Sequence, residues 1–222
     1  MTDATLLAPT GALRASINLG NPVLAQGTPQ QPRGITVDLA RELALRIGVP
    51  LHLLCFTAAR DSYAALVEGR ADVGFLAIEP ARETEVAFTA PYIVIEGVYV
   101  APADSSVATA ADVDRPGIRV GVKRGSAYDL FLTRTLQHAE VVRGEEGVEV
   151  YLAEGLEVGA GIRQPAAAWV AAHPGQRLVE PRFMEIRQAV ATPHRAAAGQ
   201  LSAFVDELVA SGWMAARTGE IA

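Results

Sequence analysis

Two positions in this chain carry residue types that can bind an anion. Arg82 offers a planar guanidinium fork that matches a carboxylate bidentately and stays charged when it is enclosed. Ser126 follows Gly125 at an expected helix start, where free backbone N–H groups and the helix dipole favour negative charge. Each of these two residues also has a structural interpretation that involves no ligand. Arg82 can pair with Glu83 or Glu85 at the surface, and the serine can simply cap its helix.

The residue types that usually carry catalysis or metal binding are scattered. The four histidines, His52, His138, His173 and His194, have no metal-ligand spacing and no nearby nucleophile motif. The glycines form neither a dinucleotide fingerprint nor a phosphate loop. Cys55 lies in an apolar run, which favours a small buried strand residue over a catalytic thiol. We therefore expect no cofactor, no metal and no catalytic residue.

Composition narrows the class of protein further. The 222 residues are 50% hydrophobic and 20% charged, which is typical of a folded chain with room for two small lobes. A net charge of -6 and a pI near 5.3 argue against a nucleic-acid partner, because phosphate binding needs a clustered basic face. We expect no membrane-embedded segment, since no apolar run reaches about 18 residues.

The start of the chain lacks the basic and long apolar regions of a secretory leader. Two interpretations remain open. Either the protein is periplasmic and its leader is absent from this chain, or the protein stays in the cytoplasm.

The first part of the chain has the pattern of a β-α-β unit. Residues 13–19 predict a strand that runs into a loop, and residues 26–33 predict a polar, Pro-rich turn. Residues 35–47 predict an amphipathic helix that ends at Gly48. Residues 51–56 predict a buried strand, and residues 71–78 predict a second parallel strand. Ligands of open α/β sheets bind at the carboxyl ends of such strands.

The pattern begins again after the loop at residues 102–106. Residues 118–122 predict a strand, and residues 128–136 predict a helix behind a short glycine turn. Further strands and helices are expected at residues 141–142, 148–153, 158–162, 166–172, 186–191 and 201–210. The second half therefore repeats the strand and helix pattern of the first on a smaller scale, without repeating its residues.

An ordered set of segments resembles bacterial extracellular solute-binding proteins of family 3, the polar amino-acid type. These segments are residues 34–40, 66–73, 79–83 with 88–92, and 120–126. Each segment alone is a weak signal, whereas their order and spacing are fairly specific. The resemblance covers nearly the whole chain, fading after about Gly144 and returning at the strand near Ile186.

The resemblance implies an α/β protein with the type II periplasmic-binding-protein fold, in which two lobes are joined by two extended hinge crossings. The crossings are expected near residues 95–102 and 185–192. Lobe 1 would comprise residues 1–96 and 192–222, and lobe 2 would comprise residues 97–191. The implied protein is a monomer that delivers its ligand to an ABC permease at the membrane.

The same resemblance assigns Arg82 to the ligand's carboxylate and Ser126, with Gly125, to its anionic group. Other positions expected to line the ligand are given by the same correspondence: Ala77, Glu79, Asn18, Asn21, Arg163 and Gln164.

This chain departs from the family where an acidic residue usually meets an amino acid's ammonium group, because that place falls at Arg163 and Gln164. Arg163 would be a second cation for a dicarboxylate if it faces the ligand, or a solvated charge if it does not. Glu79 could meet an amine or face solvent. The two asparagines could hydrogen-bond a ligand or form turns.

These observations together predict the solute-binding protein of an ABC importer, which closes on a small anionic or zwitterionic ligand such as an amino acid or organic acid. Two alternatives remain open. One is an enzyme of the same fold, similar to prephenate or arogenate dehydratases, with Glu79 or Glu96 as its acid. The other is a cytoplasmic or receptor-attached ligand sensor.

Overall fold

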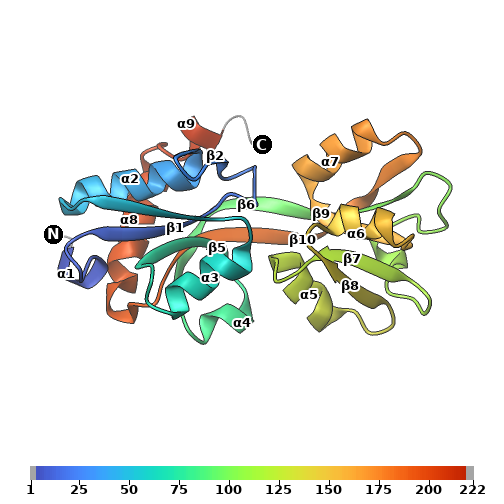
Figure 1. The fold of residues 1–222 in the computed structure, drawn as a ribbon, viewed down its shortest axis with the longest axis horizontal. Helices are drawn as coiled ribbons and strands as arrows, with labels where there is room; N and C mark the ends of the chain where they lie inside the picture. The colour runs from blue at the N-terminus through green and yellow to red at the C-terminus, as the bar shows by residue number, and fades with distance from the viewer. Residues whose placement is uncertain (1–3, 219–222) are drawn as a thin grey trace. The chain divides into compact units, whose positions relative to one another are not determined.

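The structure is a computed structural model that describes residues 4–218, and the chain in it divides into two compact units (Figure 1). Residues 1–3, which begin the segment compared with a secretory leader, and residues 219–222 lie outside this range. The second unit is Val94–Ile186, and the first unit is the chain on either side of it. The boundaries fall inside two long strands, β6 (Ala87–Pro102) and β10 (Gln176–Thr192).

In the first unit the strands follow the order β4-β1-β5-β10. The first three strands in this order are β4 (Leu51–Phe56), β1 (Leu13–Asn18) and β5 (Val73–Ala77). Strand β1 runs parallel to both of its neighbours, and the end of β10 runs antiparallel to β5. The parallel β-α-β arrangement expected from the sequence is therefore confirmed. Cys55 lies in β4 as predicted, although it is half-buried rather than fully enclosed.

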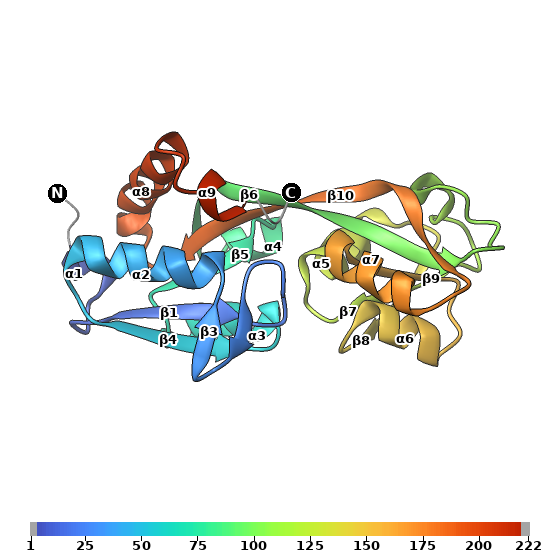
Figure 2. The same cartoon turned by 90° about the horizontal axis from the view of Figure 1, so that it is seen from above.

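The helix predicted over residues 35–47 is α2 (Ile35–Ile47), which buries Leu39, Leu43 and the last residue, Ile47. It ends at Gly48, whose φ of +71° places it in the left-handed region that favours glycine. Figure 2 shows α8 (Ala198–Ala210) near α2, and Arg46 joins the two helices through Glu207 at 3.0 Å.

The remaining helices of the first unit are short. They are α1 (Ala4–Leu7), α3 (Ala59–Val67), α4 (Pro80–Glu83), the 3-10 helix η2 (Arg195–Ala197) and α9 (Ala215–Thr218). The segment expected as a Pro-rich turn, residues 26–33, is an antiparallel hairpin made of β2 (Gln26–Thr28) and β3 (Gln31–Arg33). A proline fits there because a two-stranded hairpin leaves N–H positions that need no ladder partner.

In the second unit the strands follow the order β6-β9-β7-β8. Strand β7 (Arg119–Lys123) runs parallel to β8 (Glu140–Gly144) and β9 (Val158–Ile162), and β6 runs antiparallel to β9. The helices are η1 (Ala110–Asp112), α5 (Ala127–Thr135), α6 (Gly147–Ala153) and α7 (Arg163–Ala172).

Glycine allows α6 to approach this sheet closely. A Cβ atom at Gly147 would lie 2.1 Å from the carbonyl oxygen of Ala160, and one at Gly121 would lie 2.6 Å from that of Gly147. Side chains at these positions would force the helix away from β7 and β9.

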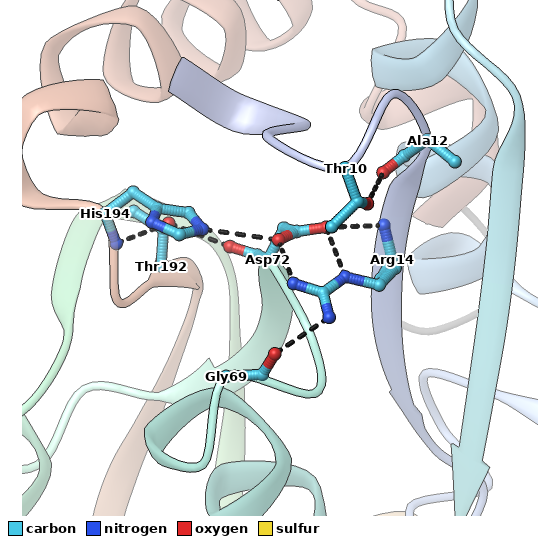
Figure 3. A network of polar contacts seen from close by, with 7 residues as sticks. All are labelled: Thr10, Ala12, Arg14, Gly69, Asp72, Thr192 and His194. Atoms are coloured by element: carbon cyan, nitrogen blue, oxygen red, sulfur yellow. Dashed lines mark hydrogen bonds and ion pairs between the residues drawn. The ribbon is translucent and has the colours of Figure 1, made fainter. Parts of the chain in front are cut away.

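The first strand of the first unit is fixed by an ion pair at its start (Figure 3). The Arg14 guanidinium donates to both oxygens of Asp72, from Nε at 3.0 Å and from Nη2 at 2.6 Å, and Nη1 donates to the carbonyl of Gly69 at 2.8 Å. The backbone N–H of Arg14 donates to the same carboxylate at 2.9 Å. The pair therefore joins β1 to the residue before β5 and to the turn after α3.

The second unit repeats this arrangement with different residues. Arg119 donates to both oxygens of Glu157, from Nε at 3.0 Å and from Nη2 at 2.9 Å, and its Nη2 also donates to the carbonyl of Gly155 at 2.6 Å. Its backbone N–H donates to Glu157 at 2.8 Å. Both pairs thus link a strand (β1 or β7), the residue before its parallel neighbour (β5 or β9) and a left-handed glycine.

The two pairs differ in burial. The Asp72 side chain is fully buried, whereas that of Glu157 is 34% exposed. Asp72 also lies 3.3 Å from Nε2 of His194, and its backbone carbonyl accepts a 2.8 Å hydrogen bond from Thr192. The pair in the first unit is therefore the more enclosed of the two.

We expect Asp72→Asn to destabilise the protein more than Glu157→Gln. Removing one charge of a buried pair leaves the other charge uncompensated, at a cost of about 3 kcal/mol, whereas exposed pairs contribute little. Urea unfolding can be followed separately in each unit, because Trp213 lies in the first unit and Trp169 in the second. Equal losses in the two variants would contradict this ranking.

The Glu157 pair also predicts a pH dependence. Hydrogen bonds from Arg119 hold the pKa of this carboxyl below its usual value. Its contribution to stability is then present above the unfolded pKa of about 4.3 and is lost as the pH falls through the lower folded pKa. The unfolding midpoints of the wild type and Glu157→Gln should differ at pH 7 and converge below about pH 4. Trp169 fluorescence in a Trp213→Phe background measures both.

Candidate functional site

Arg82 lies in the short helix that follows β5, and only 3% of its surface is exposed. The local sequence explains this placement. Glu79 is extended at the N-cap, and Pro80, with its fixed φ, opens the helix. The Arg82 N–H donates to the Glu79 carbonyl at 2.8 Å, and its Nη1 donates to the carbonyl of Ala77 at 3.1 Å. The guanidinium is thus turned back onto the end of the strand.

Burial dominates the electrostatics of this arginine. Desolvation lowers the Arg82 pKa to about 10, and the nearby Glu79 carboxylate and Tyr63 offset only part of this effect. Glu79 is itself 3% exposed, so a cation and an anion lie within one helical turn in a largely water-excluded place. A ligand carboxylate would stabilise the charged guanidinium there.

The two predicted asparagines follow β1, which is the parallel neighbour of β5. Parallel neighbours end at the same edge of a sheet, so Asn18 and Asn21 belong to the edge where Ala77 ends β5. The side chain of Asn18 accepts a hydrogen bond from the Gly20 N–H at 3.0 Å, which is a turn-forming contact. Asn21 is 6% exposed, and its Oδ1 has no hydrogen-bond partner among residues 4–218.

In the second unit Ser126 caps α5, which is the alternative to anion binding that the sequence predicted for this serine. Its Oγ accepts from the Asp129 N–H at 3.0 Å, and the Asp129 carboxylate accepts from the Gly125 N–H at 2.8 Å. Arg143 donates to the same carboxylate at 2.9 Å. Two of the N–H groups expected to be open for an anion are therefore engaged within the protein.

Arg163 is the first residue of α7, and all three of its nitrogen atoms are engaged. Its Nε donates to Glu96, while Nη1 and Nη2 donate to the two oxygens of Glu180 at 2.5 and 2.8 Å. These carboxylates, Glu180 first, raise the pKa of the arginine. Gln164, the next residue, is exposed. To act as a second cation for a ligand, Arg163 would have to give up its contacts with both Glu96 and Glu180.

The enzyme alternative depends on Glu79 or Glu96. Glu96 lies between two guanidinium groups, because Arg163 contacts one of its oxygens and Arg182 donates to the other at 3.1 Å. The carboxylate thus balances two cations.

One charged residue of this unit was not singled out from the sequence as a site residue. Lys123 ends β7, is 8% exposed and forms an ion pair with Glu146. The sequence signal was its position at the end of an apolar strand directly before Arg124 and Gly125. Tyr128 lies beside it, and burial raises the pKa of that phenol.

Within residues 4–218, no three His, Cys, Asp or Glu side chains are grouped so that they could hold a metal ion. None of the helices in this range has the length and apolar character needed to cross a membrane.

Curated proteins similar to this chain are sensors. The virulence sensor protein BvgS of Bordetella pertussis is 30% identical over 139 residues, which is 62% of this chain and 11% of BvgS. BvgS of Bordetella bronchiseptica matches equally, at 30% over 140 residues. The chain thus spans about a tenth of the length of these relatives.

Solved structures show the same fold over nearly the whole chain. A mutant of ArgBP from T. maritima is 22% identical with a TM-score of 0.77, covering 96% of each chain. A binding component of an ABC transporter from Wolinella succinogenes, complexed with lysine, is 19% identical with a TM-score of 0.78 and 95% coverage of each. The ancestral amino acid-binding protein AncCDT-1, a precursor of cyclohexadienyl dehydratase, is 19% identical with a TM-score of 0.75, covering 97% of this chain and 98% of its own.

These neighbours confirm the type II periplasmic-binding-protein fold expected from the sequence. The family model of the bacterial extracellular solute-binding proteins, family 3, matches residues 17–218, and the chain belongs to that family.

Proposed function

We propose that this protein is the solute-binding component of an ABC importer and that Arg82 binds the carboxylate of its ligand. One observation carries the proposal: the Arg82 guanidinium, which is 3% exposed and has its pKa lowered to about 10 by burial, lies in the short helix that follows β5, within the residues that the family model matches. Burial of a cation is costly unless an anion compensates it, and a ligand carboxylate would do so.

The charges around Arg82 favour an amino acid over a dicarboxylate. Glu79 supplies a buried carboxylate within the same helical turn, which suits an ammonium group. Arg163, which would be a second cation if it faced the ligand, already binds Glu96 and Glu180. Two of the solved neighbours are described as bound to arginine or lysine, which supports the same class.

We further propose that the ligand contacts residues of both units, which move together when it binds. A ligand drives such closure only as far as it prefers the closed state. The protein would act as a monomer in the periplasm and deliver its ligand to a membrane permease. Native mass spectrometry of the purified protein would identify a co-purified ligand by its mass.

The first test is Arg82→Gln, which keeps a hydrogen-bond donor and removes the charge. We expect the wild type to melt about 5–10 °C higher when a ligand is present at 100 times its Kd. The variant should lose this increase, because its ligand carboxylate has no cationic partner. Differential scanning calorimetry with L-arginine, L-lysine, L-glutamine and succinate as probes measures both proteins.

The control for this test is Arg41→Gln, which removes the same charge from an exposed arginine on α2. Its ligand-dependent increase in melting temperature should equal that of the wild type. Because Arg82→Gln also leaves Glu79 without its neighbouring cation, the double variant Arg82→Gln/Glu79→Gln shows whether a lower apo melting temperature comes from that carboxylate. An Arg82→Gln protein that keeps the full increase would exclude Arg82 as the carboxylate partner.

A second pair of variants separates the two roles of Ser126. Ser126→Ala removes the cap of α5 and should cost about 1 kcal/mol of unfolding free energy, whereas Ser126→Asn keeps a good N-cap. We expect Ser126→Asn to unfold like the wild type and to bind ligand more weakly, because it lacks the hydroxyl. Urea unfolding and calorimetric titration give the two quantities, and unchanged affinity in Ser126→Asn would leave the serine a structural cap alone.

A second candidate function is a ligand-sensing module, which the similarity to BvgS favours. Neighbouring genes that encode a permease and an ATPase would support transport, and neighbouring genes for a signalling kinase would support sensing. Uptake of the identified ligand by cells that lack this gene decides between them, since only a transport component reduces uptake when it is lost.

The ion pairs around Glu96 support an enzymatic dehydration less than they support ligand binding. Both oxygens of Glu96 are engaged by Arg163 and Arg182, so this residue lacks the open position that a catalytic acid needs. Incubation with prephenate or arogenate and absorbance detection of an aromatic product tests the activity directly.

A further inference from the structure

The helix that carries Arg82 is contacted by a residue that lies more than 100 positions later in the chain. Arg195 begins η2, just after β10 ends, and its Nη2 donates to the carbonyl oxygens of Glu83 and Thr84 at 2.9 Å each. These carbonyls lie at the end of α4, one and two residues after Arg82. A single guanidinium nitrogen therefore holds the end of the four-residue helix.

This helix needs an external partner. Four residues are far below the length at which a helix is stable alone, and the last carbonyls of any helix have no partner within it. The hydrogen bonds Arg82 N–H to Glu79 and Val86 N–H to Arg82 close its turn. A cation at the carboxyl end also interacts favourably with the helix dipole.

Arg195 is itself held by the sheet. Just before it, Thr192 donates to the Asp72 carbonyl at 2.8 Å, the His194 N–H donates to Thr192 at 3.1 Å, and the His194 ring lies 3.3 Å from the Asp72 carboxylate (Figure 3). The segment that carries Arg195 is thus fixed at the start of β5, while the arginine's side chain binds the helix that follows the same strand.

We propose that Arg195 is a positioning residue for Arg82. It acts through the backbone of α4, which it binds at the carbonyls of Glu83 and Thr84, and so keeps the buried guanidinium against the carbonyl of Ala77. Its effect on ligand affinity rests on the proposed function, whereas its effect on the order of α4 does not.

The test measures α4 without any ligand. Amide hydrogen exchange of residues 82–86 and the NMR signal of the Arg82 Nε–H group are compared in the wild type, Arg195→Ala and Arg195→Lys. We expect exchange in this segment to be at least tenfold faster in Arg195→Ala, with a shifted or broadened Arg82 signal. The lysine variant should restore part of the protection, since one ammonium can donate to both carbonyls.

Arg41→Ala is the matched control, because it removes an exposed arginine of the same unit that lies on α2. Exchange of residues 82–86 that stays unchanged in Arg195→Ala overturns the proposal. Faster exchange spread equally over β1 and α2 overturns it as well, because Arg195 would then stabilise the whole unit rather than α4.

The consequence for binding is measured with those of L-arginine, L-lysine and L-glutamine that bind the wild type. Arg195→Ala should weaken affinity at least fivefold in the wild-type background and less than twofold in an Arg82→Lys background, because the two residues act through one contact. Equal losses in both backgrounds overturn the coupling. If none of the probes binds the wild type, the proposed ligand class fails, and hydrogen exchange alone decides the role of Arg195.

Discussion

Both units depend on one kind of interaction, in which an arginine at the start of a strand, β1 or β7, binds the carboxylate directly before the parallel neighbouring strand, β5 or β9. Arg14 and Asp72 form it in one unit, and Arg119 and Glu157 form it in the other. In each case the arginine's backbone N–H and its side chain bind the same carboxylate, so the strand is held both in position and in register. The same guanidinium also donates to a glycine carbonyl, which joins the preceding helix to the pair.

Fixing the starts of the strands determines where they end. Because β1 and β5 run parallel from the Arg14 pair, their carboxyl ends reach the same edge, where Asn18 and Ala77 lie and where α4 begins. Within the first unit, Asp72 therefore precedes β5 and Arg82 follows its other end. Asp72 is compensated by an arginine and approached by His194, whereas burial lowers the pKa of Arg82 to about 10. The buried cation Arg82 thus follows the end of β5, which is the end where we propose that the ligand binds.

The sequence predicted those features that depend on neighbours in the chain. The apolar spacing over residues 35–47 and the glycine at position 48 predicted the observed bounds of α2. The apolar run before Arg82 predicted β5. The hairpin at residues 26–33 was missed because its two prolines and polar residues are typical of a turn. The cap formed by Ser126 was predicted, since it needs only a residue three positions later.

Long-range pairs leave no such local pattern. The sequence did not show that the Arg14–Asp72 and Arg119–Glu157 pairs are equivalent, because one acid is aspartate and the other glutamate. The residues of the two pairs are also 58 and 38 positions apart in the chain. In the same way, nothing near Arg163 in the sequence indicates Glu96, which lies 67 residues away. Such partners become apparent only when the strands that carry them are placed side by side.

The carboxylates within reach of each arginine therefore decide what that arginine can do. Arg163 contacts two acidic side chains and is 28% exposed, so solvent and protein together balance its charge. Arg82 is almost fully buried, and burial lowers its pKa to about 10 although the nearby Glu79 carboxylate acts in the opposite direction. Under the proposed function, a ligand carboxylate would gain more at Arg82 than at Arg163, because burial already disfavours the charged guanidinium before the ligand arrives.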